Sequence, residues 1–165
     1  MNNGNTVRIE AAPAATAELR TLVDELETLL SAEYPPEQQH GLSLDAIFQP
    51  HIRFFLARLR GAAVGCGGVA LFSDFAEVKR MYVRDVARGQ GVADAILARI
   101  EVEVRDAGLS LLRLETGERQ VAAMRFYARA GFRRCQAFGD YTLMSPQSIA
   151  TSVFFEKRIG SPALA

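Results

Sequence analysis

The stretch covering residues 77–93 constrains the fold more than any other part of the chain. Residues 77–83 are mostly apolar or branched, as is typical of a strand, and the next residues up to Gly91 are rich in glycine and arginine. An amphipathic helix begins directly after them. A glycine loop at the start of a helix presents free backbone N–H groups, and the helix dipole there favours negative charge. The sequence therefore predicts a binding site for a phosphate-bearing ligand at this loop.

The glycines of this loop suit such a ligand, although they also fit a simpler structure. Gly89 and Gly91 lack a Cβ, so the backbone can adopt unusual dihedral angles and approach a ligand closely. Arg88 can pair with a phosphate through two donors. A plain strand-to-helix turn, in which the glycines only permit the bend, is the alternative. Dinucleotide-binding and Walker loops are disfavoured, because Asp94 stands where the first needs glycine and no Gly-Lys-Ser/Thr follows for the second.

The hydrophobic pattern predicts strands that first form a meander and then alternate with helices. This order implies a mixed sheet with helices on its faces. Alternation along the strand before the loop would place Glu77, Lys79, Met81 and Val83 on one face. The 165 residues fit a single domain, 1–165, with a core from about residue 7 to residue 159. Strands are expected at 7–10, 52–60, 63–72, 75–83, 111–115, 132–138 and 153–159, and helices at 16–32, from the loop to Gly108, and at 121–130.

Charge and cysteine content narrow the class of protein. The formal net charge is zero, so no long-range field attracts nucleic acid or an anionic membrane surface. Cys66 and Cys135 have no metal-ligand spacing, and both are expected to be unreactive, with Cys66 in a buried strand. The chain shows neither a signal pattern nor an apolar run of bilayer-spanning length, so a cytoplasmic protein is expected.

Two motifs together resemble a known family. The segment Arg88-Gly89-Gln90-Gly91-Val92-Ala93 is similar to the pyrophosphate loop of the GNAT superfamily of acyl-CoA-dependent N-acyltransferases. Downstream, residues 126–132 resemble the family's Leu-Tyr-x-x-x-Gly-Phe segment. The resemblance covers residues 52–158 and extends loosely to the first strand and helix.

The resemblance implies a particular fold and a particular acyl donor. The fold would be α/β (α+β), with a mixed, mostly antiparallel central sheet, splayed central strands and helices on both faces. Acetyl-CoA would be the acyl-donor substrate, with no metal. Its pyrophosphate would lie on the loop, and its pantetheine arm would lie along the preceding strand. The implied donor-binding residues are Met81, Tyr82, Val83, Arg88, Gly89, Gln90, Gly91, Val92, Ala93 and Gln120.

Attack of an amine on a thioester requires an acid and a base. By the resemblance, Tyr127 would be the acid that donates a proton to the leaving sulfur; the alternative is a tyrosine that only packs in the core. Glu77 would be the base, acting directly or through water. The alternatives are a solvated strand-edge charge paired with Lys79 or Arg80, or water as the only base. Gln120 stands where relatives often have asparagine and can equally be a simple helix-start residue.

Other residues remain open at this stage. Glu115 follows a buried strand and can either bind the amine or cap the next turn. His40 and His51 are expected to be structural or at the surface. Tyr34, Phe138 and Tyr141 would flank an acceptor pocket or simply pack in loops. The remaining phenylalanines, at positions 54, 55, 72, 75, 126 and 132, are expected in the core.

The functional hypothesis is transfer of an acetyl group from acetyl-CoA to a primary amine of a small or amino-acid-like molecule, by direct attack in a ternary complex. The alternatives are a non-catalytic acyl-CoA-binding sensor and an acetyltransferase for protein N-termini or lysines. A small-molecule amine is the expected partner, with no nucleic acid and no membrane, and a homodimer is compatible with the sequence. The acceptor's identity is not encoded in any motif.

Overall fold

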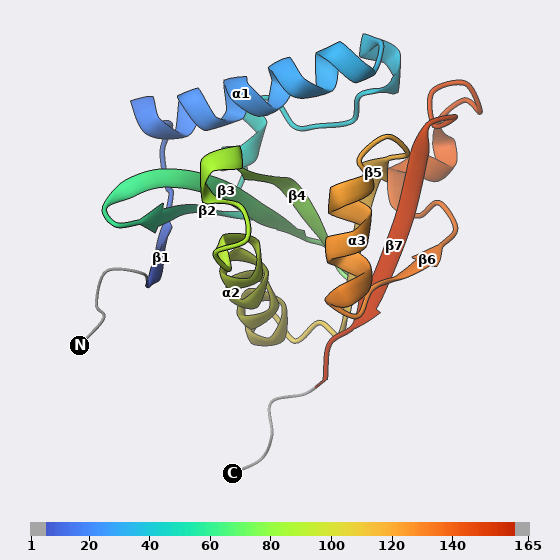
Figure 1. Ribbon diagram of the computed structural model, residues 1–165. Helices are drawn as coiled ribbons and strands as arrows, with labels where there is room; N and C mark the ends of the chain where they lie inside the picture. Colours follow the sequence, from blue (N-terminus) through green and yellow to red (C-terminus); the bar gives the residue numbers. More distant parts are fainter. Residues whose placement is uncertain (1–5, 161–165) are drawn as a thin grey trace.

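The computed structural model describes residues 6–160; residues 1–5 and 161–165 of the predicted domain lie outside this range. Within it, seven strands form one mixed sheet in the order β1-β2-β3-β4-β5-β7-β6 (Figure 1). Only the β4–β5 pair is parallel, which confirms the predicted mostly antiparallel sheet. The strands are β1 (Val7–Ala11), β2 (Ile52–Leu59), β3 (Ala62–Leu71), β4 (Ala76–Val83), β5 (Leu111–Gly117), β6 (Arg133–Cys135) and β7 (Ser152–Arg158).

Helices cover both faces of the sheet, as expected. Helix α1 packs on one face, and α2 and α3 pack on the other (Figure 1). None of the helices within residues 6–160 is both long enough and apolar enough to cross a bilayer. The helices are α1 (Ala17–Glu33), α2 (Val92–Asp106) and α3 (Val121–Arg129), with short 3₁₀ turns η1 (Pro36–Gln38), η2 (Ala46–Phe48), η3 (Asp85–Ala87) and η4 (Gly139–Leu143).

Local chemistry sets the bounds of α1. The Thr16 hydroxyl accepts a hydrogen bond from the backbone N–H of Leu19 at 3.2 Å and caps the first turn. Leu19, Leu22 and Val23 are fully buried against the sheet. The helix ends at Tyr34, directly before Pro35, because the residue before a proline disfavours helical dihedral angles.

Strands β4 and β5 pair only where they begin. The ladder holds Ala76 against Leu112 and Glu77 against Arg113, and it ends there. Strand β5 then pairs along its whole length with β7, while β4 remains paired with β3. The two central strands therefore diverge, as predicted, and the edge of β4 that faces β5 has no strand partner beyond Glu77.

The predicted alternation along β4 is wrong, because a β-bulge interrupts it. Cys66 pairs with Tyr82 and Gly68 pairs with Lys79, so β4 holds one more residue than β3 between these pairs. Arg80, in the bulge, has a left-handed φ of 53°. Lys79, Arg80 and Tyr82 consequently lie on the α1 face with Glu77, while Met81 and Val83 lie on the α2 face.

Three further details complete the comparison with the predicted elements. Strand β6 is shorter than the predicted 132–138 and spans only Arg133–Cys135. Phe72 was expected in the core but is 39% exposed, because it lies in the β3–β4 turn beside Phe75. The Cys66 thiol is fully buried as expected, and burial raises its pKa to about 12; burial also raises the pKa of the half-buried Cys135.

Candidate active site

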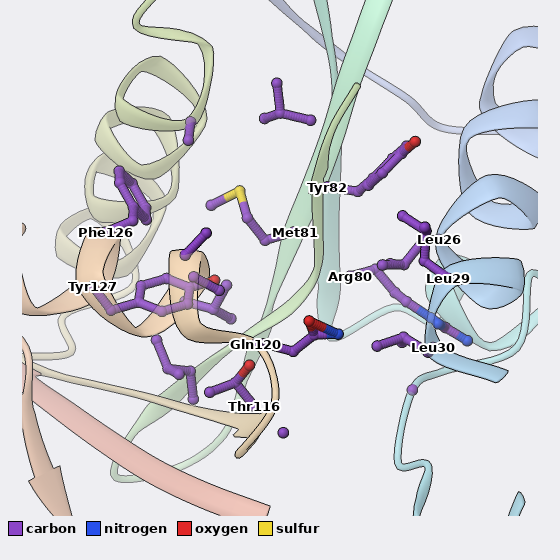
Figure 2. A pocket seen from close by; sticks show the side chains of 18 of the residues that line it. Leu26, Leu29, Leu30, Arg80, Met81, Tyr82, Thr116, Gln120, Phe126 and Tyr127 are labelled. Atoms are coloured by element: carbon purple, nitrogen blue, oxygen red, sulfur yellow. The ribbon is translucent and has the colours of Figure 1, made fainter. Parts of the chain in front are cut away.

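A cleft of about 740 Å³ occupies the gap between the diverging strands. Its walls come from β4, the end of β5, the start of α3, the last turns of α1 and the loop before α2. Figure 2 shows Tyr127 and Met81 on one side of β4, and Arg80, Tyr82 and the leucines of α1 on the other. Residues far apart in the sequence thus face one space, which we treat as two parts. After the roles that the resemblance implies, the donor end comprises residues 81–83, 87–89 and 91–94 with α3, and the acceptor end comprises residues 34, 38–41, 77–80, 115–117, 119 and 141.

Unpartnered backbone amides line the donor end. The first helical hydrogen bond of α2 runs from the Ala95 N–H to the Gly91 carbonyl. Among residues 6–160, the amides of Gly89 to Ala93 have no acceptor in the protein. Gly89 and Gly91 have φ values of 75° and 81°, and a Cβ at either would meet no protein atom within 4 Å. The amides therefore face open space at a positive helix terminus, which is the geometry of an anion site.

The side chains of the same loop take different positions. Arg88 is exposed and forms an ion pair with Asp85 at 2.8 Å. Gln90 does not line the cleft; its side-chain amide donates to the Val86 carbonyl at 3.2 Å. Val92 is buried in the core beneath the loop, and its backbone alone is available to a ligand. The predicted donor residues Met81, Tyr82 and Val83 all line the cleft.

Tyr127 lies on α3 with its ring packed between Phe132 and Phe155. The residue is only 6% exposed and still lines the cleft. Its hydroxyl has no hydrogen-bond partner among the described residues. Burial raises the pKa of this phenol, so it stays protonated at neutral pH. Gln120 precedes α3, makes no side-chain cap, and extends into the cleft near Thr116 (Figure 2).

Glu77 is a buried, bonded carboxylate rather than the solvated strand-edge charge that the sequence left open. It is 4% exposed. One oxygen, Oε2, accepts hydrogen bonds from the Tyr141 hydroxyl at 2.7 Å and from Lys79 Nζ at 2.8 Å. Burial and the neighbouring Glu77 charge raise the pKa of Tyr141. The sequence left Tyr141 open between pocket and loop packing; the structure places it in the cleft, beside Glu77.

Glu115 and His40 also reach the cleft. Glu115 Oε2 accepts a 2.6 Å hydrogen bond from the Ser152 hydroxyl. Burial raises the pKa of Glu115; the Ser152 bond and the more distant His40 and Lys79 act in the opposite direction, and the Glu77 charge adds to the rise. His40 Nε2 lies 2.9 Å from the Ser148 carbonyl, and its ring meets the Tyr141 ring edge-on.

Two loops close against each other at the acceptor end. Residues 34–42 form the front loop and residues 145–151 the back loop. Besides the His40 contact, the Ser148 hydroxyl donates to the Glu37 carbonyl at 2.9 Å, and Gln38 bonds to both Gln147 and Thr151. The Tyr34 hydroxyl accepts from the Arg119 N–H at 2.9 Å, which ties the end of α1 to the segment after β5.

Comparison with known proteins identifies the family to which this chain belongs. The GNAT acetyltransferase family matches residues 21–132. The IAA acetyltransferase of Azospirillum brasilense is 42% identical over 82% of this chain and 87% of its own length. The chain belongs to the GNAT acetyltransferase family. It is therefore an acyltransferase.

Solved structures agree with this assignment. A Klebsiella pneumoniae protein assigned to the acyl-CoA N-acyltransferases superposes with a TM-score of 0.74 at 30% identity, over 94% of this chain and 99% of that one. N-acetylglutamate synthase from Neisseria gonorrhoeae, solved with coenzyme A and N-acetyl-glutamate, has a TM-score of 0.72 at 18% identity. That match covers 94% of this chain and 35% of the synthase, and at this identity it shows the fold alone.

One component of this GNAT cleft was missed by the sequence reasoning. Arg80 has a guanidinium that is 7% exposed, donates to the Leu42 carbonyl at 2.8 Å and pairs with Glu27 at 3.0 Å. It binds the front loop to α1. A Cβ at Gly41 would overlap this guanidinium, so a larger residue there would have to displace Arg80 or the front loop. A lone arginine in a strand carries no signal of such a role, because the bulge that turns it toward α1 is set by strand register.

Proposed function

We propose that this GNAT enzyme transfers an acetyl group from acetyl-CoA to a primary amine of a small molecule, by direct attack in a ternary complex. One observation carries the proposal: Gly89, Gly91, Val92 and Ala93, whose amides have no partner among the described residues, line the same cleft as Tyr127. A diphosphate on these amides and a thioester beside Tyr127 would then belong to one ligand.

The residues present fit acetyl-CoA on chemical grounds. Free N–H groups at a helix N-terminus suit a pyrophosphate. The unpaired edge of β4 beside Met81 and Val83 offers backbone groups to an amide-containing arm. Gln120 adds a side-chain amide at the mouth of α3. When bound, acetyl-CoA supplies an activated acyl group and a good leaving group.

Tyr127 is the proposed acid. In the reaction the amine nitrogen bonds to the acyl carbon, the carbon–sulfur bond breaks, and its electron pair goes to sulfur. The phenol of Tyr127 donates to that sulfur. Because burial raises the pKa of Tyr127, we expect the phenol to keep its proton until negative charge develops on the sulfur.

Glu77 is the proposed base that receives a proton from the amine, directly or through a water molecule. Its carboxylate lines the cleft and accepts a hydrogen bond from Lys79 Nζ at 2.8 Å. The bonds from Lys79 and Tyr141 both end on Oε2, so among the described residues Oε1 has no hydrogen-bond donor and can receive the proton. This role is a proposal, and Glu77→Gln tests it through kcat.

The test of the function is turnover with purified protein. Free thiol released from acetyl-CoA is measured over a panel of small amines, and acetyl-CoA binding is measured separately by calorimetry. We expect binding in the micromolar range typical of enzyme substrates, about 1 μM to 1 mM, and thiol release only when an amine is present. Binding without turnover on any amine would favour the sensor, and absence of binding would reject both.

A further inference from the structure

The charges at the acceptor end are unevenly paired. Lys79 pairs with Glu77 at 2.8 Å, and Arg80 pairs with Glu27 at 3.0 Å. Arg119 pairs with Glu33 at 3.5 Å. Among residues 6–160, each lysine and arginine of the acceptor end therefore already has a carboxylate partner, and His40 is held by the Ser148 carbonyl.

Glu115 is the opposite case, because it is a carboxylate of the acceptor end that lacks a cationic partner among the described residues. Among residues 6–160 it forms no salt bridge, and its hydrogen bond comes from the neutral Ser152 hydroxyl. His40 and Lys79 act on it only at longer range, and each is held elsewhere: His40 by the Ser148 carbonyl and Lys79 by Glu77. A largely desolvated carboxylate without a counter-charge is unfavourable unless a ligand supplies one.

We infer that Glu115 holds the ammonium group of the acceptor, and that the acceptor is a compact, free amine that carries no acid group. This inference rests on the proposed function, which it narrows to a class of substrate. The carboxylate of an amino acid, or a phosphonate, would enter a space whose cations are engaged and where Glu77 and Glu115 would repel it.

The two acceptor loops limit the size of that amine. Hydrogen bonds between residues 34–42 and 145–151, together with the Tyr34–Arg119 bond, close this end with protein. A polypeptide would have to open these contacts to bring its terminus to the cleft. On the α1 side of the cleft, Leu26, Leu29 and Leu30 form an apolar wall (Figure 2), which suits an uncharged body on the amine.

The experiment compares acceptors that differ in a single feature. Phenethylamine and phenylalanine differ by one carboxylate, as do ethylamine and β-alanine. Phenylalaninamide has the size of phenylalanine without its negative charge, and the peptide Phe-Gly-Gly-amide adds length. We expect kcat/KM for phenethylamine and phenylalaninamide to exceed that for phenylalanine by at least about tenfold, and the peptide to be a poor acceptor.

Variants separate charge recognition from structural support. In Glu115→Gln the KM for the preferred amine should rise about tenfold, with the KM for acetyl-CoA changed by less than about twofold. The preference for phenylalaninamide over phenylalanine should shrink in the same variant, which a purely structural role would not cause. Glu115→Asp should recover part of the affinity. Glu118→Gln is the matched control, because Glu118 is exposed and does not line the cleft.

The outcomes separate failure of the Glu115 inference from failure of the proposed acetyltransferase function. Preference for acid-bearing amines or for the peptide, or an unchanged amine KM in a folded Glu115→Gln, would overturn the inference and leave the acetyltransferase intact. Acetyl-CoA binding without acetylation of any acid-free amine in the panel would also overturn it. Failure of acetyl-CoA to bind would instead reject the proposed function.

Discussion

The two ends of the cleft are built on different principles. At the donor end, the contiguous backbone amides of Gly89 to Ala93 have no acceptor within the part of the chain that the structure describes. At the acceptor end, side chains from distant segments are bonded to one another, as in the contacts of Glu77 with Lys79 and Tyr141. Backbone amides are present whatever the side chains, whereas a side-chain network depends on particular residues. In our proposal, that network selects the acceptor.

The largest expected effect breaks the donor end. Gly91→Glu should abolish acetyl-CoA binding, lowering affinity at least about 100-fold, because a carboxylate beside the amides repels the pyrophosphate. Calorimetry with acetyl-CoA measures the change. Gly61→Glu is the matched control, since Gly61 has a similar φ of 82° and open space around it, but lies in the β2–β3 turn. Unchanged affinity in Gly91→Glu would remove the loop from the site.

The second-largest expected effect tests Tyr127 as the proposed acid. Tyr127→Phe should lower kcat about 100-fold while changing acetyl-CoA affinity by less than about twofold, because the hydroxyl acts only as sulfur departs. Steady-state kinetics and calorimetry together give the comparison. Tyr82→Phe, which removes a hydroxyl on the α1 face of β4, should change kcat little. Equal losses in turnover and donor affinity for Tyr127→Phe would contradict the assignment of the acid.

A smaller effect should be confined to the acceptor end. Gly41→Ala places a methyl group against the Arg80 guanidinium and must shift either the arginine or the front loop. We expect the amine KM to rise about threefold to tenfold and stability to fall by about 1–3 kcal/mol, with acetyl-CoA affinity retained. Gly160→Ala, at a glycine with no neighbour within 4 Å, is the control. A loss of donor affinity instead would show that the two ends are not separable.

The smallest effect concerns stability and pH. Burial raises the pKa of Glu115 above its ordinary value of 4.5, against the smaller opposing effects of Ser152, His40 and Lys79. The folded protein then keeps this proton to higher pH than the unfolded chain, so stability falls as pH rises through that interval. Glu115→Gln should therefore be slightly more stable than the parent at neutral pH, and the difference should shrink toward pH 4.5. Denaturant unfolding at both pH values measures it, and a less stable variant at neutral pH would contradict the sign.

Much of the fold followed from local patterns. Leucine spacing with Thr16 ahead and Tyr34-Pro35 behind bounded α1 to within a residue at each end. The glycine loop fell at the start of α2, and Gly108 followed its end. In contrast, strict alternation failed in β4, because the extra residue at Arg80 is a property of how β4 pairs with β3.

By itself, the sequence determined the glycine loop before α2, the family and the order of the elements, because these depend on contiguous residues and on short-range periodicity. Only the tertiary structure decided the acceptor end. It buried Glu77 against Tyr141, which is 64 positions away, turned Arg80 toward α1, and left Glu115 without a cationic partner among the described residues. Pairing between distant side chains depends on strand register and loop closure. Neither can be predicted from the residues that flank those side chains in the sequence.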